Sequence, residues 1–366
     1  MKIPYTNLKK QYEDEKFELN KIIKSVLKSG NYVGGNQIKI FEKNISNYCN
    51  KKYCVSLNSG TDALTFALYC LGVKRGDEVI TPPNSFIAST ASIVHLGAIP
   101  VFVDVLNDQN IDPDLIASKI TKKTKVIMPV HLTGRMCQMD RIKKIANKYK
   151  IKIIEDAAQS IGSLYKNKKS GSWGDVSCFS AHPLKNLNAI GDAGYLLTDS
   201  KSIYNKIQDL KSHGMTSRNV IKNFGYVSRM DNLQAAVLNY RFKKLNKIIL
   251  KRRENAKNYI KYITTKKAFI PDEKKFEFNT YHTFVIQVPK RDKLKHYLEK
   301  CGIATSIHYP VPIHLQPASK RFGYKKGNFP NTEKQAKRIL TLPINQYIDK
   351  KMIKYISNKI NKFFEN

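Results

Sequence analysis

The feature that most constrains the fold is a regular alternation of short apolar runs and helical patterns along the first 200 residues. Each apolar run is followed by a stretch in which apolar residues recur at helical spacing. This alternation is typical of a mostly parallel β-sheet with helices on both faces, so we predict an α/β fold. The expected strands cover residues 53–57, 78–81, 100–103, 125–130 and 151–155.

The remaining patterns divide the chain into two parts. A domain takes ~150 residues, so 366 residues allow two domains. We expect a large domain at 1–244 and a smaller α+β domain at 245–366. Strands at 176–180 and 194–198 have little helix between them, which predicts an antiparallel or edge part of the sheet. Further helices are expected at 8–29, 36–49, 232–261, 291–300 and 350–363, with a helix start at Asp112-Pro113 and strands at 282–288 and 304–308.

The charge of the chain is extreme, with 64 basic against 29 acidic residues and a net charge of +35. Only 11 of the basic residues are Arg, the residue that phosphate and base recognition favours. A lysine excess spread along the whole chain indicates a solvated surface that helps to attract anionic substrates. It does not favour nucleic acid as the partner.

The composition also bears on the compartment. Apolar residues make up 42% of the chain, but no apolar run reaches the ~18 residues that a membrane helix needs. The first residues have no apolar signal-peptide region. Six cysteines are scattered without a CxxC pair, which indicates reduced thiols and neither a disulfide framework nor a metal site. We therefore expect a cytoplasmic protein.

Two motifs lie where strands are expected to end. Asn58-Ser59-Gly60-Thr61 opens a helix, and the free N–H groups of a helix N-terminus bind phosphate. The alternative is a plain helix cap by Ser59 or Thr61. Glu155-Asp156 ends an apolar strand, the place where open α/β sheets bind ligands. A carboxylate there can hold a protonated ring nitrogen, although Asp156 as a helix cap is the alternative.

Two further motifs follow. Residues 178–186 run from a strand into a turn that presents Lys185, and a lysine of lowered pKa can form a Schiff base. The glycines of 191–194 supply the tight backbone that such a loop needs. Residues 224–236 lead through Arg229 into a helix capped by Asp231. The alternative for this last motif is a helix start with a surface arginine.

The order of these motifs, SGT, EDAAQ, S-x-H-P-x-K-N and S-R-M-D-x-L-Q-A-A, resembles the DegT/DnrJ/EryC1/StrS family of pyridoxal-phosphate sugar aminotransferases. The resemblance runs from Ile3-Pro4 to the loop that begins at Tyr309. It implies a fold-type-I aminotransferase architecture and pyridoxal 5'-phosphate as cofactor, with pyridoxamine 5'-phosphate as the intermediate form. It also implies a homodimer with active sites at the subunit interface.

The resemblance also implies a role for each matching residue. Lys185 would hold the cofactor covalently, and Asp156 would keep its pyridine nitrogen protonated. Gln159 would lie near the ring hydroxyl, and Phe86 would stack on the ring. The cofactor phosphate would be cradled by Gly60, Thr61 and Ser180.

Other matching positions are candidates for contacts with the substrate or the neighbouring subunit. They are His182, Arg229, Tyr309 and His314. Val227 departs from the family pattern, because many members have an asparagine there that reaches the phosphate of the neighbouring subunit. A valine side chain cannot donate that hydrogen bond.

The function implied is transamination in two halves, with L-glutamate as the expected amino donor and Lys185 as the proton carrier. The expected acceptor is a keto group of a nucleotide-linked deoxy-sugar for surface polysaccharide. A small phosphorylated ketone such as dihydroxyacetone phosphate, used in capsule synthesis, is the alternative. A sugar dehydratase working with the amine form of the cofactor is disfavoured, because that branch has His in place of the lysine. A regulator without enzymatic activity is disfavoured because no nucleic-acid-binding pattern is present.

Overall fold

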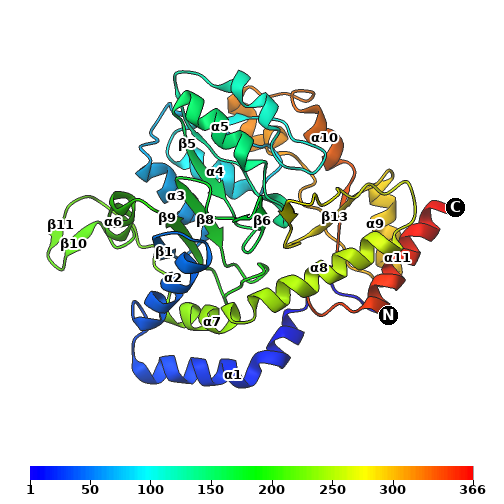
Figure 1. Ribbon diagram of the computed structural model, residues 1–366, viewed down its shortest axis with the longest axis horizontal. Helices are drawn as coiled ribbons and strands as arrows, with labels where there is room; N and C mark the ends of the chain where they lie inside the picture. The colour runs from blue at the N-terminus through cyan, green and yellow to red at the C-terminus, as the bar shows by residue number, and fades with distance from the viewer. Residues whose placement is uncertain (366) are drawn as a thin grey trace.

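The protein is described by a computed structural model that covers residues 1–365. Its centre is a seven-stranded sheet in the order β1-β9-β8-β5-β4-β2-β3 (Figure 1). The five strands from β8 to β3 are parallel, and β9 is antiparallel to both of its neighbours. In sheet order the strands are β1 (Tyr53–Leu57), β9 (Gly194–Thr198), β8 (Val176–Ser180), β5 (Lys152–Asp156), β4 (Thr124–Ile127), β2 (Glu78–Thr81) and β3 (Ile99–Phe102). The predicted α/β class is confirmed.

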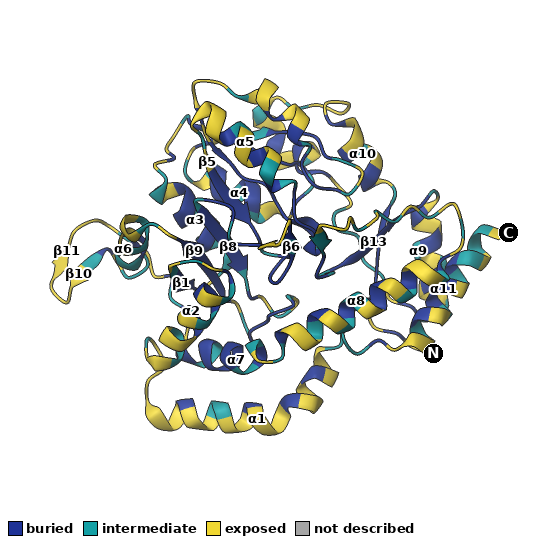
Figure 2. Ribbon diagram, viewed as in Figure 1, coloured by how far each residue is buried: buried dark blue, intermediate teal, exposed yellow. Residues whose placement is uncertain are grey.

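Both faces of the sheet are covered by helices, and most residues of its strands are buried (Figure 2). One face packs against α3 (Gly60–Cys70), α4 (Ile87–His95) and α6 (Lys201–Leu210). The other face packs against α2 (Asn36–Tyr48), α5 (Met139–Tyr149) and α7 (Asn232–Phe242). Consecutive strand residues point to opposite faces of the sheet, since Val55 packs in the cluster with α3 and Cys54 in the cluster with α2.

The C-terminal part has its own apolar cluster. It is built by β13 (Phe284–Gln287), β14 (Ile339–Leu342), α9 (Arg291–Lys300) and α11 (Lys350–Glu365). Helix α8 (Leu245–Tyr262) contributes Ile249 to the cluster beneath the sheet and Tyr259 to the C-terminal one. Ile3 also packs in the C-terminal cluster, and its N–H donates to the carbonyl of Gly302 at 2.8 Å. The domain boundary at 244/245 stays a prediction.

Several expected elements differ in the structure. The helix expected over 232–261 is two helices, α7 and α8. The strand expected at 304–308 is a single bridge, because Ala304 donates to Ile3 whereas Ser306 pairs with Thr341. The start at Asp112-Pro113 opens a 3-10 turn, Pro113–Leu115, in which Asp112 caps the N–H of Asp114 at 2.9 Å. Strand β9 lies inside the sheet, so of the two expected placements the antiparallel one is confirmed.

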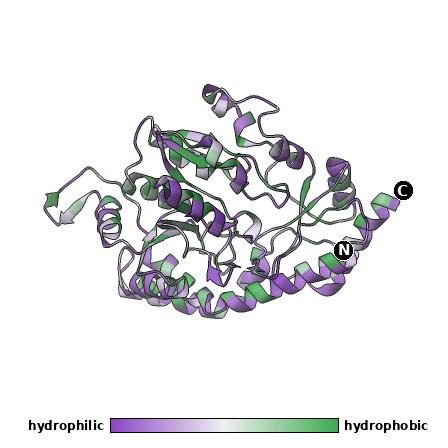
Figure 3. Cartoon of the chain, turned by 45° about the horizontal axis from the view of Figure 1, so that its top comes forward, coloured by the Kyte–Doolittle hydropathy of each residue, from purple (hydrophilic) through white to green (hydrophobic). Residues whose placement is uncertain are grey.

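The remaining elements are peripheral. Helix α1 (Leu8–Ser29) matches its expected bounds, and Figure 3 shows hydrophilic residues spread over helices in every part of the chain. The hairpin of β10 (Met215–Ser217) and β11 (Val220–Ile221) stands away from the body in Figure 1. Within residues 1–365, no helix is both long enough and apolar enough to span a membrane. The other short elements are α10 (Pro330–Ala336), β6 (Leu164–Tyr165), β7 (Lys168–Lys169) and β12 (Glu277–Phe278).

Candidate active site

A cavity of about 320 Å³ lies at the carboxyl ends of β1, β5 and β8, where an open α/β sheet binds its ligands. The structure brings most of the predicted site residues into its wall. These are Gly60, Thr61, Phe86, Asp156, Gln159, Ser180, His182, Lys185 and Tyr309. Arg229 and His314 are not in that wall.

One end of the cavity is the N-terminus of α3. Ser59 caps the helix, since its hydroxyl accepts from the N–H of Asp62 at 3.1 Å. The N–H groups of Gly60 and Thr61, at the first two helical positions, have no partner within the helix and are available to an anion. Gly60 has no room for a side chain, because a Cβ there would lie 2.8 Å from the Cβ of Ser180. The backbone therefore forms a cradle of the size and polarity that a phosphate needs.

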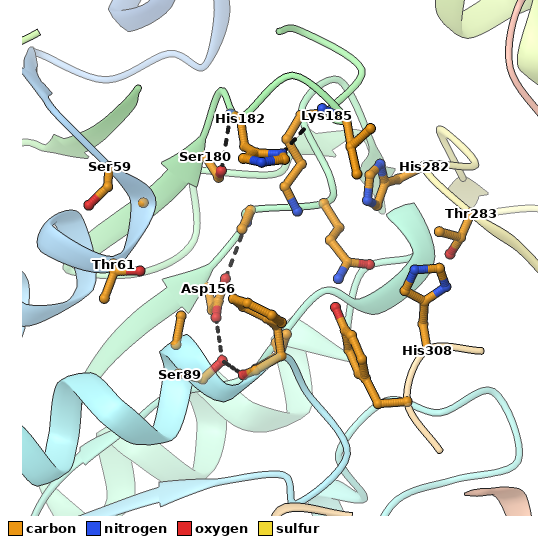
Figure 4. Close-up of a pocket in the computed structure, with 18 of the residues that line it drawn as sticks. Ser59, Thr61, Ser89, Asp156, Ser180, His182, Lys185, His282, Thr283 and His308 are labelled. Carbon is orange, nitrogen blue, oxygen red and sulfur yellow. Dashed lines mark hydrogen bonds between the residues drawn. The ribbon is translucent and has the colours of Figure 1, made fainter. Parts of the chain in front are cut away.

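Asp156 lies at the middle of the cavity wall, and Figure 4 shows its carboxylate held from below by Ser89. The Ser89 hydroxyl donates to it at 2.7 Å, and the N–H of Ala158 donates at 3.2 Å. Burial raises the pKa of Asp156, while these two donors and the Lys185 charge oppose that rise. The residues directly after β5 form a turn and not a helix, so Asp156 is not a helix cap. It is a buried acid that faces the cavity.

Glu155, the preceding residue, points to the other side of β5. Its carboxylate accepts from the N–H groups of Gly171, Trp173 and Gly174 at 2.7 to 3.0 Å and from the Ser177 hydroxyl at 2.8 Å. His131 Nε2 donates to it at 3.0 Å, because the His131 Nδ1 accepts from a main-chain N–H. Burial favours the neutral acid, but these hydrogen bonds lower the pKa of Glu155 to about 2. Glu155 thus stabilises the fold and takes no part in the cavity.

Lys185 follows β8 on a turn fixed by its own N–H, which donates to the carbonyl of His182 at 2.8 Å. Figure 4 shows its side chain reaching into the cavity between Asp156 and His282. Burial lowers the pKa of Lys185 to about 8, although the Asp156 charge opposes the shift. His182 is exposed, and its ring accepts from the N–H of Leu184 at 3.3 Å, so it also shapes the turn. The result is an amine that is substantially neutral, and so nucleophilic, near pH 8.

This lowered pKa predicts how the cofactor-free protein reacts with pyridoxal. A protonated amine is inert toward an aldehyde, so adduct formation at Lys185 should rise with pH and level off above about 8. Lysines on the open surface should instead continue to gain reactivity as the pH approaches the ordinary lysine pKa of ~10.4. Borohydride trapping and peptide mapping between pH 6.5 and 10 would measure both in one sample. A Lys185 profile that followed the exposed lysines would contradict the assignment.

The opposite end of the cavity contains residues that sequence reasoning missed, namely Tyr5, Arg252, His282, Thr283 and His308. Ser89, which lies beneath Asp156, was also missed. His308 bonds to the Thr341 hydroxyl at 3.0 Å, and burial together with the Lys185 charge lowers its pKa to about 4. Arg252 is buried although it belongs to α8, a helix with many basic residues. The only sequence signal for this end was the proline-bearing loop at Tyr309.

Two predicted residues lie elsewhere in the chain. His314 is buried away from the cavity wall, and its ring lies 3.1 Å from the Glu333 carboxylate. Arg229 lies two residues after Val227, at the end of the segment 220–229, in which most side chains are exposed. Within a single chain, the structure gives neither His314 nor Arg229 a place at the cavity.

A lysine of lowered pKa that lines the cavity after β8 and a carboxylate at the end of β5, set in this sheet beside a helix N-terminus, define an aminotransferase of fold type I. The chain belongs to the DegT/DnrJ/EryC1/StrS aminotransferase family, whose model matches residues 13–361.

Named relatives agree with this placement. A "Pleiotropic regulatory protein" of Geobacillus stearothermophilus is 37% identical and covers 100% of both chains. The "dTDP-3-amino-3,6-dideoxy-alpha-D-galactopyranose transaminase" of Aneurinibacillus thermoaerophilus is 36% identical over 99% of each. The crystal structure of S. venezuelae DesV "in complex with ketimine intermediate" matches with a TM-score of 0.97 and 33% identity, covering 100% of this chain and 99% of that one.

Proposed function

We propose that this aminotransferase works with pyridoxal 5'-phosphate and moves the amino group of L-glutamate to the keto carbon of a nucleotide-linked deoxy-sugar. The observation that carries the proposal is the Lys185 amine, with its pKa of about 8, facing the buried Asp156 in one cavity. The cradle at Gly60 and Thr61 fits the phosphate of this cofactor, and Phe86 is an exposed aromatic ring in the same wall that fits its pyridine ring.

The residues divide the work. When bound, the cofactor supplies a conjugated ring that withdraws electrons from the carbon bearing the amino group. Asp156 would hold a proton on the ring nitrogen, because a carboxylate beside that nitrogen favours its charged form. Lys185 would bind the cofactor covalently and, as a free amine, would move a proton at the reacting carbon. Gln159 is oriented for the ring hydroxyl by the N–H of Thr133, which donates to its Oε1 at 2.8 Å.

The acceptor class rests on the relatives. The transaminase of Aneurinibacillus thermoaerophilus is named for a dTDP-linked amino sugar, and it covers the chain from end to end. A surplus of positive charge suits the diphosphate of such a substrate. We place the reaction in the cytoplasm, as a step toward surface polysaccharide. A small phosphorylated ketone is the competing acceptor that the assay must test.

The decisive experiment measures the visible absorption spectrum of the purified protein. The purified protein should gain a visible absorption band with pyridoxal 5'-phosphate and lose it when L-glutamate is added. Adding a dTDP- or UDP-linked keto sugar should restore the band, whereas dihydroxyacetone phosphate should not. If only dihydroxyacetone phosphate restored the absorption band, the acceptor would be a small phosphorylated ketone and not a nucleotide-linked sugar. A protein that never develops the band would refute the whole proposal.

We further propose a homodimer in which residues 220–229 reach the cavity of the other subunit. Five apolar side chains of this segment are at least half exposed, and Phe224 is 96% exposed. Figure 2 shows the adjoining hairpin standing out from the body. Arg229, at the end of this segment, does not line the cavity of its own chain. A surface of this kind is unfavourable in water and is stabilised by burial against a partner.

A mixed dimer tests this arrangement. A Lys185→Ala subunit paired with an Arg229→Ala subunit should regain one intact site per dimer, and thus up to about half of the wild-type activity. Each parent homodimer should be inactive or strongly impaired. Differently tagged subunits, purified through both tags, would be assayed against the two parents. Activity no higher than that of the better parent would mean that the segment serves its own chain.

A further inference from the structure

The first turn of α4 brings two side chains to the cavity wall. Phe86 is the N-cap residue of this helix, and Ser89 follows three residues later. Both line the cavity, but Phe86 is 55% exposed whereas Ser89 is 1% exposed. Figure 4 shows Ser89 beneath Asp156, with the hydrogen bond between them drawn as a dashed line. One turn of helix therefore carries the aromatic ring of the wall and a buried hydroxyl that reaches the acid.

The Ser89 hydroxyl has one proton and two acceptors within reach. Its Oγ lies 2.7 Å from Asp156 Oδ2 and 3.4 Å from the carbonyl oxygen of Phe86. A serine in a helix commonly donates to a carbonyl one turn back. Here the carboxylate is the closer acceptor, and hydrogen bonds to a charged oxygen are the shorter and stronger kind. The proton of Ser89 is therefore directed at Asp156.

The carboxylate of Asp156 is held at both oxygens. Oδ2 accepts from the Ser89 hydroxyl, and Oδ1 accepts from the N–H of Ala158 at 3.2 Å. Each oxygen keeps a further lone pair, so the acid can still accept a hydrogen bond from a group in the cavity. Within residues 1–365, Ser89 is the only side chain that donates to this carboxylate. The direction of the acid therefore depends on this hydroxyl and on one main-chain N–H.

The charge of Asp156 also depends on Ser89. Burial raises the pKa of Asp156, and the Ser89 hydrogen bond is the largest of the effects that oppose this rise. The Ala158 N–H and the charges of Lys185 and His131 act in the same direction with smaller effect. The other titratable groups near this carboxylate are Cys137, Cys178 and Tyr309. A hydrogen bond donated to a carboxylate stabilises its charged form.

We propose that Ser89 is a positioning residue that keeps the Asp156 carboxylate charged and aimed at the ring nitrogen of the cofactor. This rests on the proposed transamination. Without its side-chain donor, the carboxylate is a stronger base and takes a larger share of the proton that the ring nitrogen needs. That proton is what lets the ring withdraw electrons. Because Ser89 and Phe86 share one helical turn, the same contact also fixes the acid relative to the aromatic ring of the wall.

The first test is a titration of Asp156 in the protein without cofactor. Carbon-13 NMR of protein labelled at its aspartate carboxyl groups follows each pKa, and the Asp156 signal is the one that Asp156→Asn removes. Ser89→Ala should raise the pKa of Asp156, because the charged form loses its side-chain donor. An unchanged pKa of Asp156 in a folded Ser89→Ala variant would overturn the proposal.

Matched variants separate this contact from the packing of α4. Ser92→Ala removes an equally buried hydroxyl from the same helix, one that donates to the Ser89 carbonyl at 3.0 Å, and should leave the pKa of Asp156 unchanged. Ser89→Thr keeps the hydroxyl and should stay close to the wild type. Melting curves identify any variant that does not fold, and Ser89→Cys, a weak donor, carries the test if Ser89→Ala fails. Equal shifts for Ser92→Ala and Ser89→Ala would contradict the proposal.

A double-mutant cycle extends the test to the reaction. Ser89→Ala should lower kcat by about 10-fold, because a hydrogen bond to a charged group is lost. In the Asp156→Asn background the same change should alter kcat by less than about 2-fold, because the amide holds no ring proton. Equal losses in both backgrounds would mean that Ser89 only stabilises the fold, and would overturn the proposal. If the wild type never transaminates, the proposed function fails, whereas the NMR titration still decides whether Ser89 keeps Asp156 charged.

Discussion

Lys185→Ala is expected to reduce turnover by at least about 10³-fold, because this residue supplies both the covalent attachment and the proton carrier. The fold should persist, since the side chain of Lys185 reaches into a cavity and its turn is set by main-chain hydrogen bonds. Steady-state rates and melting temperatures of the purified variant would be compared with those of Lys201→Ala, which alters an exposed lysine.

A small primary amine offers a second measurement on the same variant. Ethylamine fits the space left by the lysine side chain and should restore part of the proton transfer. Ready turnover without any added amine would show that Lys185 is not the reacting group.

Asp156→Asn is expected to lower the rate by about 10²- to 10³-fold while the cofactor remains bound, because a neutral amide cannot hold the ring proton as a carboxylate does. The Asn oxygen can still accept from Ser89, so the local structure should survive. Rates at saturating substrate and the absorption spectrum of the bound cofactor would separate loss of chemistry from loss of binding.

Glu155→Gln is the matched control on the adjacent position. Glu155 takes no part in the cavity but accepts several buried hydrogen bonds, so its amide variant should lose thermal stability and keep most of its rate when folded. A near-normal rate for Asp156→Asn would show that Asp156, like Glu155, stabilises the fold and takes no part in the reaction.

The sheet could be predicted from the sequence because buried parallel strands are continuous apolar runs. Strands β1, β2, β8 and β9 have the expected bounds, and the motif residues at their ends meet in one cavity. Such motifs are local in sequence, and the carboxyl ends of strands converge in any fold of this class. That geometric rule explains why Asp156 and Lys185 lie at one edge of the sheet, whereas their expected roles came from the family resemblance.

The other end of the cavity had no comparable signal. Arg252 is one of many basic residues on a helical stretch, and only the packing of α8 against the loop at Tyr281 reveals that it is buried. His282 and His308 reach the cavity from two separate segments of the C-terminal part. His314 had a motif position and yet packs against Glu333, because proximity in a loop does not fix the direction of a side chain.

In strand β5, successive side chains point to opposite faces of the sheet, and this alternation decides which acid faces the cavity. Glu155 pairs with Ser177 and Asp156 with Cys178, so the two acids fall on opposite sides of one ribbon. Inserting a single residue at the start of β5 would move Glu155 to the place of Asp156 and Ile154 to the place of Glu155. The longer glutamate would face the cavity, and an apolar side chain would meet the donors that now bind the Glu155 carboxylate. A frame error of one position would therefore change the identity of the acid at the cofactor and also break the bonds that hold the strand in place.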